Sequence, residues 1–140
     1  MAKITFTQPI YTFHIDFIGH VSNIVYVQWM EIGRHKLLEA IGLQEEKIAK
    51  SGFLPVLAST QISYIKPLYM GDHVRIEMWL SELRRASACV EFRFFNQQQE
   101  LVAQGTQKGL FIDTQTQKPH RLSNEHRAMF EPYLGEEVVY

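Results

Sequence analysis

The feature that most constrains the fold is residues 23–41, where apolar side chains recur at helical spacing. One broad stripe of this segment holds Tyr26, Trp29, Met30, Gly33, Leu37, Ala40 and Ile41. Other sides of the same predicted helix are also apolar, which is typical of a buried helix rather than a surface one. Ser22 or Asn23 can cap its start, and Gly42 can end it. The rest of the chain must therefore enclose this helix.

Strand-like runs surround the predicted helix. They cover residues 4–14 before it and residues 54–64, 73–83, 87–95 and 101–113 after it. In the clearest runs apolar and polar side chains alternate, which indicates strands with one buried face. Their short connections predict that successive strands are antiparallel neighbours. The pattern predicts an α+β fold with a curved antiparallel sheet wrapped round one long central helix, and with an exposed edge open to a second copy.

Length and composition limit the classes of protein that fit. A chain of 140 residues is long enough for a single domain, residues 1–140, without disulfides or a structural metal. Its only cysteine, Cys89, excludes an intrachain disulfide framework. A net charge of -1 without a basic tract argues against nucleic acid as a partner. With no signal peptide and no apolar run of about 18 residues, we expect a soluble, cytoplasmic protein that does not bind membranes.

The most informative segment for chemistry is residues 14–23, just before the predicted helix. Amides at a helix N-terminus carry partial positive charge, which suits a carbonyl oxygen that becomes an oxyanion. Gly19 lets a substrate approach the backbone, and Asp16 can act as nucleophile or as general base for water. Composition alone favours a structural role for Asp16 in bracing the turn. His20 can likewise bind substrate or brace the turn, and Asn23 can orient an acyl group or cap the helix.

The run DFIGHVSNIVYVQWMEIGR, residues 16–34, resembles the signature of the 4-hydroxybenzoyl-CoA thioesterase family of hotdog proteins. The matching positions are Asp16, Gly19, Tyr26, Glu31, Arg34, the later Tyr64 and Pro67, and Gly71 with Asp72. The resemblance implies a hotdog fold and an active site at a dimer interface. It also implies acyl-CoA hydrolysis without metal or another cofactor, with Asp16 as the catalytic carboxylate and amides of residues 19–23 polarising the carbonyl. Glu31 and Arg34 are best explained as an intrahelical ion pair, and a catalytic Glu31 is the alternative.

The resemblance also implies residues that contact substrate. These are Gly19, Val21, Tyr26 and Tyr64, together with Arg84 and Arg85, which lie at a turn where some relatives bind coenzyme A phosphates. Arginine suits phosphate because it donates two parallel hydrogen bonds, although an ordinary solvated turn explains both arginines equally well. Phe17, Trp29, Phe53 and Tyr64 could line an acyl pocket or simply fill the core.

Several alternatives stay open. Gly19-His20-Val21 followed by Asn23 is similar to the acyl-ACP thioesterase branch, so the carrier is either coenzyme A or acyl carrier protein. A hotdog protein that binds acyl thioesters without cleaving them is a second possibility. A hotdog dehydratase is a third, because His14 or His20 could work with Asp16. The expected assembly is a homodimer, or a homotetramer if dimers pair further. No zinc-ligand spacing, Gly-x-Ser-x-Gly elbow or phosphate-binding glycine loop occurs.

Overall fold

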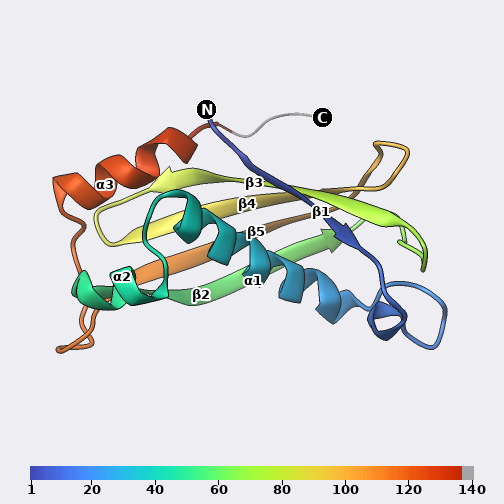
Figure 1. Cartoon of the computed structure of the whole chain (residues 1–140), viewed down its shortest axis with the longest axis horizontal. Helices are drawn as coiled ribbons and strands as arrows, with labels where there is room; N and C mark the ends of the chain where they lie inside the picture. The colour runs from blue at the N-terminus through green and yellow to red at the C-terminus, as the bar shows by residue number, and fades with distance from the viewer. Residues whose placement is uncertain (137–140) are drawn as a thin grey trace.

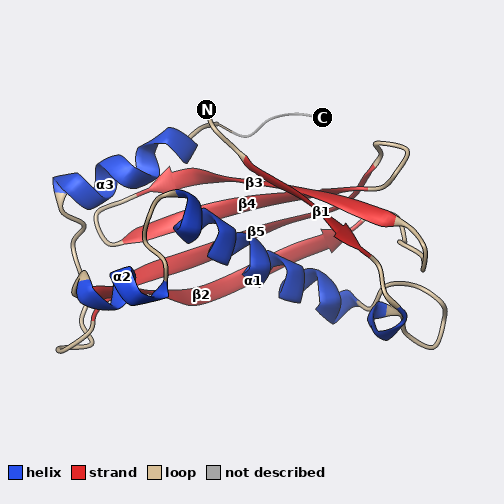
Figure 2. Cartoon of the chain, viewed as in Figure 1, coloured by secondary structure: helices blue, strands red, loops and turns tan. Residues whose placement is uncertain are grey.

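The computed structural model describes residues 1–136. One antiparallel sheet contains β1 (Ile4–Pro9), β2 (Phe53–Tyr64), β3 (His73–Leu83), β4 (Ser87–Phe95) and β5 (Leu101–Asp113). Helix α1 (Asn23–Ala40) lies across one face of the sheet, and the short helices α2 (Glu45–Lys50) and α3 (Asn124–Phe130) lie at one end of the molecule (Figures 1 and 2). Two short 3-10 helices, η1 (Thr12–His14) and η2 (Glu131–Tyr133), complete the structure. The one-domain prediction for residues 1–140 includes residues 137–140, which lie outside the described residues.

Helix α1 packs closely against the inner face of the sheet. The buried residues of α1 are Val25, Tyr26, Trp29, Met30, Gly33 and Leu37. A Cβ atom at Gly33 would lie 2.8 Å from Met78 Sδ and 2.9 Å from Phe92 Cε1. Such distances are too short for carbon, so glycine is what allows α1 to approach β3 and β4 so closely. The apolar sheet face therefore holds α1 in a fixed position.

The other side of α1 is not enclosed. Ile24 is 68% exposed and Ile32 is 38% exposed, while Glu31 and His35 also face solvent. The prediction that the sheet wraps round the helix and buries it on more than one side is therefore wrong for the single chain. The physical reason is that a five-stranded sheet covers only one side of a helix that lies across it. Exposed apolar side chains on α1 remain available for a partner.

The strand order is β1-β3-β4-β5-β2, which corrects a second expectation. Strands β3, β4 and β5 are antiparallel neighbours as predicted, but β2 pairs with β5 and not with β3. Residues 65–72 do not form a turn between neighbouring strands; they carry the chain from one part of the sheet to another. Leu68 O accepts a hydrogen bond from Val21 N at 2.9 Å, and Tyr69 forms an isolated bridge with His20. The segment is thus tied to the residues that precede α1.

Smaller differences have local causes. The first strand ends at Pro9, five residues before the predicted end, because η1 follows. Helix α2 was not predicted. Ser123 as a cap and Pro132 as a terminator predict a last short helix over residues 123–131, and α3 agrees, since Ser123 Oγ accepts a hydrogen bond from His126 N at its start. Within residues 1–136, no helix is both long enough and apolar enough to cross a membrane.

Strand β2 forms one edge of the sheet in the described part of the chain. It is 12 residues long, and all but two of its residues are exposed. Leu54, Val56 and Leu57 are exposed apolar side chains on this edge. A long apolar edge strand with unpaired backbone groups is a template for pairing with another strand.

Candidate active site

The predicted catalytic residue Asp16 lies in a tight turn directly before α1. Ile15 and Val21 form an antiparallel bridge at the base of the turn. Asp16 N donates to His20 O at 2.9 Å, and Gly19 N donates to Asp16 O at 3.1 Å. Gly19 has a φ of +87°, in the left-handed region that favours glycine. The turn is therefore a specific structure that depends on Gly19, as the sequence suggested.

The Asp16 carboxylate braces this turn with only one of its oxygens. Oδ1 accepts hydrogen bonds from Ile18 N at 3.0 Å and from His20 N at 3.3 Å. Among the described residues, no donor is hydrogen-bonded to Oδ2. The side chain is partly exposed, so solvent and substrate can reach it. Bracing and catalysis, which the sequence set against each other, are thus compatible in one carboxylate.

The amides that could polarise a carbonyl are fewer than predicted. Most amides of residues 19–23 already donate a hydrogen bond: Gly19 N to Asp16 O, His20 N to Asp16 Oδ1, Val21 N to Leu68 O and Ser22 N to His14 O. Within the described part of the chain, the amides of Asn23 and Ile24 have no acceptor. Ser22 occupies the N-cap position of α1, but neither its side chain nor that of Asn23 caps the helix. The positive end of α1 is therefore open at these two amides.

Aromatic residues surround the turn. The His20 ring packs edge-on against the Tyr69 ring, with 5.2 Å between centroids. Tyr64 Oη donates to Asn23 O at 2.8 Å and so joins the last residue of β2 to the first residue of α1. Burial raises the pKa of Tyr64, which keeps its hydroxyl protonated as a donor. Phe17, at the tip of the turn, is fully exposed.

Two other predicted contact residues lie in the core. The side chains of Val21 and Tyr26 are only 3% and 2% exposed. Tyr26 packs against the rings of Trp29, Tyr64 and Phe94. Its burial, together with the neighbouring Tyr64, raises the pKa of Tyr26. A substrate therefore cannot touch these side chains without rearrangement of the core.

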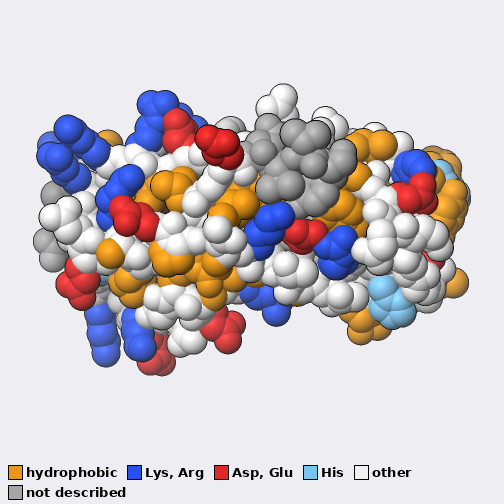
Figure 3. Space-filling view, turned by 90° about the horizontal axis from the view of Figure 1, so that it is seen from above, with side chains coloured by type: hydrophobic (Ala, Val, Ile, Leu, Met, Phe, Trp, Pro, Cys, Tyr) orange, Lys and Arg blue, Asp and Glu red, His pale blue; other side chains and the backbone are white. Residues whose placement is uncertain are grey.

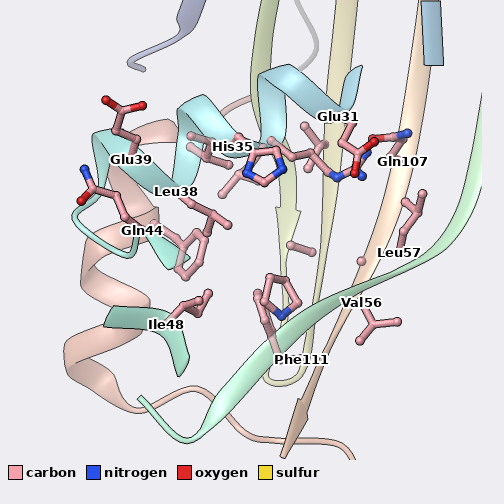
Figure 4. Close-up of a pocket in the computed structure, with 18 of the residues that line it drawn as sticks. Glu31, His35, Leu38, Glu39, Gln44, Ile48, Val56, Leu57, Gln107 and Phe111 are labelled. Atoms are coloured by element: carbon pink, nitrogen blue, oxygen red, sulfur yellow. The ribbon is translucent and has the colours of Figure 1, made fainter. Parts of the chain in front are cut away.

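A large cavity lies at the far half of α1, away from Asp16. It has a volume of about 720 Å³ and is bounded by α1, α2, β2 and the inner face of the sheet (Figure 4). Its apolar lining consists of Leu37, Leu38, Ile48, Pro55, Val56, Leu57, Leu80, Ala88, Val90, Gly109, Phe111 and Phe130. None of the four residues suggested for an acyl pocket (Phe17, Trp29, Phe53 and Tyr64) lines it.

Two polar residues at the cavity, Arg34 and Gln107, are already hydrogen-bonded. Arg34 Nη1 donates to Gln107 Oε1 at 2.6 Å, and Gln107 Nε2 donates to Thr60 Oγ1 at 3.1 Å. Burial lowers the pKa of Arg34, and the nearby Glu31 opposes that shift. Within the described residues Glu31 and Arg34 form no direct ion pair, so the predicted intrahelical pair is wrong. Arg34 instead reaches across to β5.

Arg84 and Arg85 lie in a basic groove at the β3–β4 hairpin. Arg121 and Arg127 line the same groove, which has a volume of about 700 Å³. Arg84 Nη2 forms an ion pair with Glu82 Oε1 at 2.6 Å. The hairpin and α3 lie at the end of the sheet opposite the Asp16 turn, and basic side chains gather at this end (Figures 1 and 3). One copy of the chain therefore does not bring these arginines to Asp16.

Sequence reasoning missed the cavity and the two additional arginines. Arg121 and Arg127 are distant in sequence from the hairpin and join it only through the fold. Ala88 and Gly109 were a usable signal for the cavity, because small residues inside strands leave space on the inner face. Within residues 1–136, no group of three or more His, Cys, Asp or Glu side chains could hold a metal ion.

Comparison with known proteins adds independent information. Residues 12–130 match a family model described as the thioesterase-like superfamily. A candidate acyl-CoA thioesterase of Bacillus subtilis, YneP, is 28% identical over 104 residues, which cover 74% of this chain and 75% of YneP. The chloroplastic acyl-acyl carrier protein thioesterase ATL3 of Arabidopsis thaliana is 27% identical over 128 residues, which cover 89% of this chain and 66% of ATL3.

A solved structure shows the same fold. The Staphylococcus aureus protein SAV2348, in complex with CoA, superposes with a TM-score of 0.91 at 12% identity. The superposition covers 99% of this chain and 89% of SAV2348. At this identity the likeness shows the fold alone.

Proposed function

The chain belongs to the thioesterase-like superfamily, and from this membership we propose that it is an acyl-CoA thioesterase of the 4-hydroxybenzoyl-CoA thioesterase type. In this proposal residues 1–140 form one hotdog domain that works as a homodimer. The observation that carries the proposal is that, among the described residues, a carboxylate oxygen without a hydrogen-bond donor, Asp16 Oδ2, and two amides without an acceptor, Asn23 N and Ile24 N, lie at the two ends of one short turn.

The proposed mechanism follows from these groups. The thioester carbonyl oxygen accepts hydrogen bonds from Asn23 N and Ile24 N, where the helix dipole stabilises negative charge in the transition state. Asp16 Oδ2 either attacks the carbonyl carbon, giving a mixed anhydride that water hydrolyses, or removes a proton from an attacking water. In both cases the coenzyme A thiolate leaves and takes up a proton. The products are a carboxylic acid and free coenzyme A.

The proposed dimer is supported by the edge of β2. A twofold axis normal to the sheet pairs two copies of β2 in antiparallel fashion and extends both sheets into one. Such pairing puts the Phe53 end of one β2 beside the Tyr64 end of the other. Tyr64 is bonded to the start of α1, so the Asp16 turn of each copy lies beside the cavity end of its partner. The exposed apolar side chains around the turn, such as Phe17 and Ile24, would be covered there.

The carrier is proposed to be coenzyme A, with acyl carrier protein as the alternative. The basic groove formed by Arg84, Arg85, Arg121 and Arg127 suits the nucleotide phosphates of coenzyme A. In the proposed dimer this groove lies at the same end as the partner's Asp16. An acyl carrier protein would present one phosphate and an acidic surface. Because the chain is similar in sequence to ATL3, acyl carrier protein is the alternative carrier that the experiment includes.

The experiment is a thiol-release assay with purified protein and a panel of acyl-CoAs, run beside the same acyl groups on acyl carrier protein. We expect thiol release from acyl-CoA at a rate that exceeds the rate for acyl carrier protein. Binding of acyl-CoA without thiol release would point to a non-catalytic acyl-binding protein. Hydration of an enoyl-CoA without thiol release would point to a dehydratase and would refute the proposal.

A further inference from the structure

The large cavity next to β2 has no assigned ligand. We propose that it binds the acyl group of the substrate and that it selects linear aliphatic chains, with Ala88 and Gly109 setting how long a chain fits. This inference rests on the proposed function and deepens it. It also assigns the cavity of one copy to the reacting carboxylate of its partner.

The chemistry of the cavity favours an aliphatic ligand over a polar aromatic one. Its volume of about 720 Å³ is within the range of small-molecule sites, and most of its lining residues are apolar. The one deeply buried amide there, Gln107, is 1% exposed and has both its oxygen and its nitrogen bound, to Arg34 and Thr60. Gln107 is therefore already bound and is not left to recognise a ring hydroxyl or a second carboxyl group, and the other polar lining residues all lie on α1 or within residues 44–47. Glu31, His35 and Glu39 lie along the α1 side of the opening (Figure 4).

Two small residues on adjacent strands line the cavity. Ala88 on β4 and Gly109 on β5 are direct partners in the strand register. Their neighbours on the same face, Val90 and Phe111, also line the cavity but have larger side chains, so this pair leaves space that larger residues would fill. A Cβ at Gly109 would meet only Val56 O, at the ordinary contact distance of 3.7 Å. A Cβ can therefore be added at position 109 without a close contact, and a larger side chain built on it would occupy the space of the ligand.

The position of the cavity assigns it to the partner's catalytic turn. Pro55, Val56 and Leu57 belong to the first half of β2 and line the cavity. Antiparallel pairing of two β2 edges brings this half beside the partner's Tyr64 and the start of its α1. A thioester carbonyl held at the partner's Asn23 N can thus extend its alkyl chain into this cavity.

The first test measures kcat/KM for saturated acyl-CoAs from acetyl to palmitoyl, and for benzoyl-CoA. Each methylene buried should raise kcat/KM about fourfold until the cavity is full. Gly109→Val should lower kcat/KM for decanoyl-CoA by at least about tenfold while changing butyryl-CoA by less than about twofold. Lys108→Val, on the opposite face of the same strand, is the matched control and should keep the wild-type profile. A flat chain-length profile, a preference for benzoyl-CoA, or an unchanged profile in Gly109→Val would overturn the inference.

The second test uses mixed dimers purified through two different tags, one copy carrying Asp16→Asn and the other Gly109→Val. If cavity and carboxylate belong to different copies, one site of the two is intact and decanoyl-CoA is hydrolysed at about half the wild-type rate. If they belong to the same copy, each site carries one defect and the rate stays near that of the single variants.

A third measurement separates failure of this inference from failure of the proposed function. Binding of decanoate is measured by calorimetry with wild type and with Gly109→Val. If wild type cleaves no acyl-CoA but binds decanoate, and Gly109→Val weakens binding by about tenfold or more, the proposed function fails and the aliphatic site stands. If decanoate does not bind wild type, the aliphatic site is rejected whatever the thiol-release assay shows.

Discussion

Asp16→Asn is the substitution that most directly tests the chemistry. An asparagine keeps an oxygen at the Oδ1 position, so it can still accept the hydrogen bonds from Ile18 N and His20 N at 3.0 and 3.3 Å. It replaces Oδ2, the oxygen without a donor, by an amide nitrogen that can neither attack a carbonyl carbon nor accept a proton. The change therefore removes the proposed reactive atom and leaves the brace of the turn in place.

The two consequences differ in size. A positioned general base contributes about 10²–10⁴-fold to a rate. We therefore expect kcat for acyl-CoA hydrolysis to fall by that factor, with KM changed by less than about threefold, because Oδ2 acts mainly in the transition state. The two hydrogen bonds to Oδ1 are kept, but their acceptor is no longer charged. Because the turn is partly exposed, we expect a loss of about 1 kcal/mol in the free energy of unfolding.

Asp16→Ala provides the matched comparison. It removes Oδ1 as well and leaves two amides without their acceptor, so it should cost about 1–3 kcal/mol in the free energy of unfolding while lowering kcat to the same extent as asparagine. Thiol release gives kcat and KM, and urea denaturation gives the stability. If Asp16→Asn retains more than about a tenth of the wild-type kcat, the carboxylate is structural and the mechanism is wrong.

Four further results are expected. Tyr64→Phe removes the hydrogen bond that joins β2 to the start of α1 and should lower the free energy of unfolding by about 1 kcal/mol in urea denaturation. Arg121→Ala should raise KM for acyl-CoA several-fold, less so at high salt, and should leave acyl-pantetheine hydrolysis unchanged, since that substrate lacks the nucleotide phosphates. Ser59→Lys on the β2 edge should shift the proposed dimer toward monomers in sedimentation experiments and reduce activity in parallel, because like charges would face each other across the proposed twofold axis. Burial lowers the pKa of His14, whose Nδ1 accepts a hydrogen bond from the Tyr11 amide. The contribution of neutral His14 to the free energy of unfolding should therefore be complete above pH 6.5 and should decline as the pH falls below that value. His14→Gln should flatten this part of the stability–pH profile.

The local elements of the fold were predictable from sequence because their signals are local. The period of two in residues 73–83 and 87–95 gave strands with the bounds that the structure has. The Asp16 turn and the start of α1 at Asn23 followed from Gly19 and from the apolar stripe behind it. These signals depend on side chains a few residues apart, which a single sequence records directly.

What the sequence could not predict depends on contacts across the fold. Residues 65–72 do not reveal that β2 and β3 are not neighbours in the sheet. The path of this segment depends on contacts across the fold, such as the hydrogen bond from Val21 N to Leu68 O. The partner of Arg34 is Gln107, 73 residues away, and not the nearby Glu31 that helical spacing suggested. The amide of Val21 is likewise lost as an oxyanion donor through a contact across the fold, its hydrogen bond to Leu68 O, whereas those of Gly19 and His20 are bound within the turn itself.

The crossover of residues 65–72 also bears on the order of events in folding. The turn that holds Asp16 is anchored through Val21 to Leu68 and through His20 to Tyr69, residues that lie nearly fifty positions later in the chain. Contacts between such distant residues close large loops and form after local ones. In a refolding experiment the helical and strand signals should therefore recover first, and enzymatic turnover should be the last property to return.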